Sequence, residues 1–147
     1  MDNSKVEDAT KYFEGDLNCC QSMIMTYGPD YGLSKDTGIR LGTGFAGGMA
    51  RHGEVCGAVT GAIMIIGLKF GMKEEDDSQA RDKTYELVKE FLDRFKTKHE
   101  SIRCRDLLEC DIGTPEGRAL ANEKGLFKTL CPKLVKSAAE ILEEQIL

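Results

Sequence analysis

Apolar residues recur at helical spacing along almost the whole chain, and this periodicity is what most limits the folds open to it. The first apolar stripe lies on one helix face and consists of Phe13, Leu17, Cys20, Ile24 and Tyr27. We predict one amphipathic helix across this stripe, ended by the turn residues Gly28 and Pro29.

Start and stop signals divide the rest of the chain into further helices. Ser34 or Asp36 caps a second helix that runs to about Met49, and Thr114-Pro115 starts another. The other predicted helices span about 54–70, the region from the acidic run 74–77 through Phe95, the region from Ser101 to near Gly113, and the region from Pro132 onward. Since no alternating strand pattern exceeds about four residues, we predict an all-α fold. We expect a compact single-domain bundle of six or seven helices over residues 1–147.

Composition narrows the classes of function. The 25 acidic and 20 basic residues give a net charge of −5, so the chain lacks the positive excess that a nucleic-acid partner requires. The polar, acidic N-terminus does not resemble a targeting signal. The most apolar stretch, Val55–Leu68, has 14 residues and is too short to span a bilayer. We therefore expect a cytoplasmic protein without membrane insertion.

Small residues are spaced four apart in the middle of the chain. One row is Gly53, Gly57 and Gly61, and the other is Gly38, Gly42, Ala46 and Ala50. Rows of small residues on a helix edge let two helix backbones approach closely. We predict a close-packed, glycine-rich helix pair around Cys56.

The six cysteines carry the chemistry that the sequence suggests. A reducing compartment makes a disulfide framework improbable, which leaves metal ligation, redox chemistry or burial. Cys20 lies in the centre of its apolar stripe and is predicted to be structural, whereas Cys19 lies on the flank. Cys104 points toward the core, and Cys110, about 120° further around the same helix, points away. The predicted site is therefore Cys19, Cys56, Cys104 and Cys131.

Two of these thiols are predicted to be acidified by helix N-termini. Cys56 falls in the first turn of the predicted third helix, and Cys131 precedes Pro132 as an N-cap. Free backbone N–H groups there would lower the pKa of both thiols, whereas burial would raise the pKa of Cys20.

Five segments resemble the C-GCAxxG-C-C family of redox-active proteins from bacteria and archaea. They are Asn18-Cys19-Cys20-Gln21, residues 44–49, Cys56-Gly57-Ala58-Val59-Thr60-Gly61, residues 104–108 and residues 131–135. The resemblance extends from about Tyr12 to Ile146. It implies an all-helical prokaryotic domain whose four defining cysteines match Cys19, Cys56, Cys104 and Cys131. The central motif reads Cys-Gly-Ala here, where the family label reads Gly-Cys-Ala.

Three functions remain open at this stage. The first is a thiol redox or electron-transfer protein, including a thiol oxidoreductase, that works with an unknown redox partner. The second is a metal site formed by the same four cysteines, holding zinc or an iron–sulfur cluster. The third is a protein that handles metals or metalloids through soft thiolates. The chain could form a homo-oligomer under each of these three functions.

Acid–base and nucleotide chemistry are disfavoured. His52 lies four residues before Cys56, but no third group is available to orient a Cys–His pair. His99 lies in a charged segment and is expected to be solvated. The GxGxxG string at 42–47 follows no predicted strand, so it does not predict a dinucleotide site.

Overall fold

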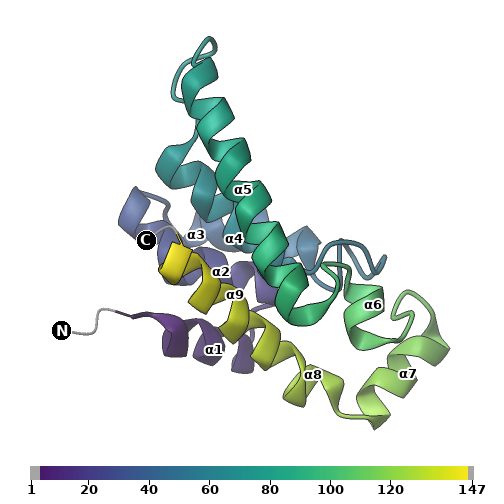
Figure 1. Ribbon diagram of the computed structural model, residues 1–147. Coiled ribbons are helices and arrows are strands. Elements are labelled where there is room, and N and C mark those ends of the chain that lie inside the picture. The colour runs from purple at the N-terminus through teal and green to yellow at the C-terminus, as the bar shows by residue number, and fades with distance from the viewer. Residues whose placement is uncertain (1–3, 146–147) are drawn as a thin grey trace.

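The computed structural model describes residues 4–145, which contain nine α-helices and two short 3-10 helices (Figure 1). The α-helices are α1 (Val6–Glu14), α2 (Cys19–Tyr27), α3 (Lys35–Gly42), α4 (Gly57–Phe70), α5 (Ser78–His99), α6 (Cys104–Leu108), α7 (Pro115–Glu123), α8 (Leu126–Thr129) and α9 (Cys131–Gln145). The 3-10 helices are η1 (Gly28–Tyr31) and η2 (Thr43–Phe45). Both ends of the predicted 1–147 domain, and Ile146, lie outside the described residues.

The predicted all-α class is confirmed, with somewhat more helices than expected. Across residues 4–145 the only β feature is an isolated antiparallel bridge between Val55 and Arg103. Ser34 and Thr114 act as the predicted N-caps of α3 and α7, and Asp77 caps α5 at the end of its acidic run. No helix within the described residues is long and apolar enough to cross a membrane.

The single helix predicted across the first stripe is wrong, because the chain breaks between Glu14 and Cys19. A capping box begins the second helix: the Asn18 side chain accepts from the Gln21 N–H at 2.8 Å, and the Gln21 side chain accepts from the Asn18 N–H at 2.9 Å. This reciprocal pair satisfies two backbone donors that a helix start leaves free. It places Cys19 at the first position of α2.

The second predicted helix is also wrong at its C-terminal end. It ends at Gly42, not near Met49, and leads through η2 into a turn over 47–51 in which every residue has positive φ. Three of these residues are not glycine: Met49, Ala50 and Arg51 have φ of 67°, 52° and 69°. Each such conformation costs roughly 1–2 kcal/mol for a residue with a Cβ. Ala46 and Ala50 therefore do not continue the small-residue row of α3.

Helix α2 packs closely against α4. The glycine spacing predicted this close approach correctly for Gly57 and Gly61, but not for Gly53. A Cβ added to Gly61 would lie 2.7 Å from the Met23 Cβ and 2.9 Å from the Cys20 carbonyl oxygen. Gly38 and Gly42 allow α3 to approach the other side of α2, where they lie against Ile24 and Gln21. Gly53 is not on α4, since that helix begins at Gly57 and not near Glu54.

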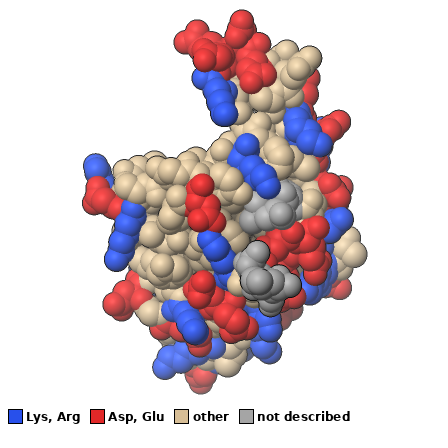
Figure 2. Space-filling model, turned by 90° about the vertical axis from the view of Figure 1, so that its left-hand side faces the viewer, with Lys and Arg blue, Asp and Glu red and all other residues tan. Residues whose placement is uncertain are grey.

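The buried apolar side chains form two clusters. The larger one joins α1, α2, α4, α5 and α9 around Met23, Ile65, Phe91 and Phe95. The smaller one, around Leu108 and nearby residues of α6–α8, lies at one end of the molecule (Figure 1). At the opposite end, the α4–α5 connection projects from the body, and acidic side chains gather over its tip (Figure 2).

Candidate thiol site

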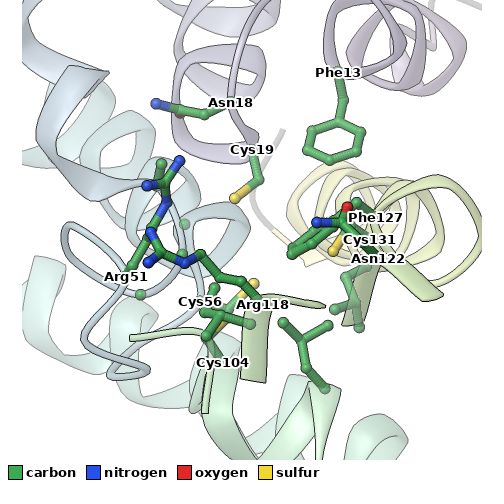
Figure 3. Close-up of a pocket in the computed structure, with 17 residues that line it drawn as sticks. Phe13, Asn18, Cys19, Arg51, Cys56, Cys104, Arg118, Asn122, Phe127 and Cys131 are labelled. Atoms are coloured by element: carbon green, nitrogen blue, oxygen red, sulfur yellow. The ribbon is translucent and has the colours of Figure 1, made fainter. Parts of the chain in front are cut away.

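A cavity of about 360 Å³ lies where the two apolar clusters meet. Its lining includes all four cysteines of the predicted site: Cys19, Cys56, Cys104 and Cys131 (Figure 3). They come from α2, the residue before α4, α6 and α9, so segments distant in sequence converge on one space. Neither Cys20 nor Cys110 contributes to this lining.

The position of Cys19 is fixed by the start of α2. Asn18 caps the helix and donates from its side chain to the Gly42 carbonyl at 3.1 Å, which links this start to the end of α3. Gln21, also buried, donates to the Ile39 carbonyl at 2.8 Å. The first turn of α2 is therefore held from two directions.

The isolated bridge brings Cys56 and Cys104 to the same cavity. The Cys56 N–H donates to the Ile102 carbonyl at 2.7 Å, and the Cys104 N–H donates to the Glu54 carbonyl at 2.7 Å. Gly48 must be glycine beside this bridge, because a Cβ would lie 2.5 Å from the Glu54 oxygen and 2.9 Å from the Cys104 Cβ. Cys56 is the N-cap of α4, while Cys104 is the first residue of α6.

The Cys19 and Cys56 thiols form a hydrogen-bonded pair between two helix N-termini. Hydrogen bonding from Cys56 lowers the pKa of Cys19 most, and the backbone amides of Cys19, Cys20 and Gly57 lower it further, which together outweigh burial. A Cβ on Gly57 would lie 2.5 Å from the Cys19 sulfur, so glycine is needed for this amide to approach. The same hydrogen bond raises the pKa of Cys56 well above its usual value, and burial adds to the rise. Cys19 is therefore the more acidic thiol of the pair, and Cys56 is the less acidic one.

The prediction of an acidified Cys131 and Cys56 is wrong. Burial, together with the neighbouring Cys19 and Cys104 thiols, raises the pKa of Cys131 to about 12. Leu130 is already helical and the Leu134 N–H donates to its carbonyl at 3.1 Å, so Cys131 is not an N-cap facing free donors. Burial also raises the pKa of Cys104 to about 11.

The two remaining cysteines are buried elsewhere. Cys20 is fully buried, and its pKa is raised to about 12 by burial, in agreement with the structural role predicted for it. Cys110 is buried in the smaller apolar cluster, away from the cavity lining.

Two arginines that the sequence did not predict as site residues also line the cavity. Arg51 is the last residue of the left-handed turn, and Arg118 comes from α7 (Figure 3). The turn could be foreseen only in part, from the glycines at 47 and 48, because three residues with side chains share its conformation.

The histidines do not take part in this site. His52 is exposed and lines a separate surface depression. The expectation that His99 is solvated is wrong: it is half-buried, packs on Phe95 and lies 2.8 Å from the buried Ser137 hydroxyl. Burial lowers its pKa.

The four cysteines of the cavity are not spaced to bind a metal ion. Among residues 4–145, no group of three or more His, Cys, Asp or Glu side chains is spaced to hold an ion. The four thiols share a cavity, but as placed they do not form a ligand set for zinc or for an iron–sulfur cluster.

Comparison with known families matches residues 17–145 to the family described as "Putative redox-active protein (C_GCAxxG_C_C)". The match covers every residue that lines the cavity, from Asn18 to Leu134, except Phe13 of α1. Comparison with curated proteins and with solved structures finds no match.

Proposed function

Because the chain belongs to the C_GCAxxG_C_C family of redox-active proteins, we propose that it exchanges electrons as a dithiol and that Cys19 and Cys56 are its reactive pair. The observation that carries this proposal is that Cys19 and Cys56 line the same cavity, with the Cys19 sulfur against Gly57 next to Cys56, and that hydrogen bonding between the two thiols lowers the pKa of Cys19. Thiol–disulfide exchange needs a thiolate with access to substrate and a second thiol within reach of it.

The two thiols differ in the way that this reaction requires. Cys19 accepts hydrogen bonds from two helix N-termini and is half-buried at the cavity wall, so it is the attacking group. Cys56 is almost fully buried and donates to it, so it is the resolving group.

The exchange balances without any further reactant. The Cys19 thiolate attacks one sulfur of a disulfide RS–SR, forms a mixed disulfide with one RS group and releases the other as a thiolate. That thiolate takes up the Cys56 proton, and the Cys56 sulfur then attacks Cys19 and releases the second RS group, which is protonated by solvent. The protein loses two electrons and forms a Cys19–Cys56 disulfide, while the substrate becomes two thiols. Cys104 and Cys131 line the same cavity, but burial raises the pKa of both, so neither is expected to attack the substrate first.

The test mixes a small disulfide with reduced, chelator-treated protein and counts how many small thiols are released per protein molecule. We expect two equivalents from the unchanged chain and none from Cys19→Ser. The Cys56→Ser variant should stop at the mixed disulfide and release one equivalent. Cys20→Ala is the matched control: it removes the neighbouring sulfur and some packing, and should still release two equivalents.

The four-cysteine metal protein remains the alternative, and the same preparation distinguishes it. A coloured or zinc-containing protein whose four thiols react only after a chelator is added would favour that alternative and contradict the dithiol proposal. It would also require the side chains to move closer than they lie here.

A further inference from the structure

The charge around the thiol cavity is opposite to that of the whole chain. The chain carries a net charge of −5, yet the lining of the cavity includes Arg51 and Arg118 and no acidic residue. Figure 3 shows both arginine side chains reaching toward the same side of the cavity, next to one another in that view. Two guanidinium groups without a carboxylate between them repel each other unless an anion is bound.

These are the two arginines that lack a partner. Within residues 4–145, neither the Arg51 nor the Arg118 side chain forms a hydrogen bond or an ion pair. The other five arginines are each paired with a carboxylate: Arg40, Arg81, Arg94, Arg103 and Arg105. Hydrogen bonding from Cys56 and from backbone amides accounts for the acidity of Cys19, so the guanidinium charges are left for another anion.

The same two arginines also border a shallow depression of about 380 Å³ on the outer surface. His52 and Arg105 line it as well, and its one acidic residue, Asp111, is paired with Arg105 at 3.8 Å. Arg51 and Arg118 therefore lie between the thiol cavity and this surface depression and border both.

We propose that the substrate of the Cys19–Cys56 pair is a small disulfide that carries carboxylate groups, with Arg51 and Arg118 binding them while its sulfur meets Cys19. This inference rests on the proposed function. A cavity of about 360 Å³ has the size of a small-molecule site. Planar guanidinium groups pair well with carboxylates. The helix N-termini that would suit a phosphate are instead directed at the Cys19 sulfur.

The test compares three small aliphatic disulfides that differ in charge: dianionic 3,3′-dithiodipropionate, neutral bis(2-hydroxyethyl) disulfide and dicationic cystamine. The rate of each with reduced protein at pH 7 and low salt is divided by its rate with mercaptoethanol, which removes differences in intrinsic reactivity. We expect the anionic disulfide to react fastest and the cationic one slowest, with a difference that shrinks as salt is added.

Variants assign this preference to the two arginines. Arg51→Gln and Arg118→Gln should each lower the rate with dithiodipropionate, relative to the rate with the neutral disulfide, about tenfold. The corresponding lysine variants should keep part of the preference. Arg94→Gln removes the same charge from the exposed face of α5 and serves as the control.

The outcomes separate the two proposals. If no disulfide oxidises the protein, the proposed function fails. If all three react alike after normalisation, or if the glutamine variants keep the full preference, the dithiol function stands and the carboxylate inference is overturned.

Discussion

At the scale of single residues, the chemistry depends on how two adjacent cysteines are separated. Cys19 begins α2 and reaches the cavity, whereas Cys20 turns into the core and is fully buried. The sequence predicted this division, and it also predicted which four cysteines would line one cavity. It did not predict which thiol is acidic, because the Asn18–Gln21 capping box that begins α2 lies within an apolar stripe that continues across it.

The ranking of the thiols also depends on burial, which a sequence does not give. Cys56 and Cys131 lie at helix starts, as expected, but the hydrogen bond with Cys19 and burial raise the pKa of Cys56, and burial raises the pKa of Cys131. Cys19 has the additional S–H donor of Cys56, and this donor reverses the balance.

Alkylation should therefore modify Cys19 first. At pH 7, iodoacetamide is expected to label Cys19 well before Cys56, Cys104 or Cys131, because the lowered pKa of Cys19 gives it the largest thiolate fraction. Replacing Cys56 by alanine removes the donor, so the Cys19 pKa should rise and its labelling should slow. Mass spectrometry of digested protein measures both; labelling of Cys131 before Cys19 would contradict the assignment.

At the scale of elements, the close contact of α2 with α4 holds the site together. Glycine spacing predicted that two helices would approach closely around Cys56, and Gly57 and Gly61 provide that approach. Spacing did not reveal that the second row ends at Gly42, since the left-handed turn that follows packs against Cys104 and Ile112, which are distant in sequence.

Two glycines of α4 give a matched test of this contact. Gly61→Ala is expected to lower the free energy of unfolding by about 1–3 kcal/mol, because its Cβ would meet the Met23 Cβ at 2.7 Å and force the helices apart. Gly67→Ala, with no heavy atom within 4 Å of the new Cβ, should raise it by up to about 1 kcal/mol through helix propensity. Urea denaturation compares the two; equal effects would mean that the α2–α4 approach is not tight.

At the scale of the whole molecule, α9 joins the elements on either side of it. The Glu143 side chain accepts from the Tyr27 hydroxyl of α2 and, at 2.9 Å, from the Lys5 N–H before α1. On another face of α9, Ser137 contacts His99 at the end of α5. The sequence predicted these helices, but it could not predict such contacts, because each pair is separated by 38 or more residues.

The His99 contact predicts a pH dependence of stability. Burial lowers the pKa of His99 in the folded protein, so protonation favours the unfolded chain. The contribution of neutral His99 to the free energy of unfolding should be constant above the pKa of histidine in the unfolded chain, about 6.5. It should be lost as the pH falls from that pKa toward the lower pKa of the folded state. The decrease in melting temperature between pH 7.5 and 5 should be smaller for His99→Gln than for the unchanged protein, whereas replacement of the exposed His52 by glutamine should leave it unaltered.

The most direct test of the account is to identify which cysteines become linked when the reduced, metal-free protein loses two electrons to one equivalent of a small disulfide oxidant. After an acid quench and digestion, mass spectrometry should find a peptide that joins Cys19 to Cys56, with Cys20, Cys104, Cys110 and Cys131 still as free thiols. A first disulfide that excludes Cys19, or a cavity whose thiols stay reduced while the protein holds a metal, would contradict the central claim that Cys19 and Cys56 are the reactive pair.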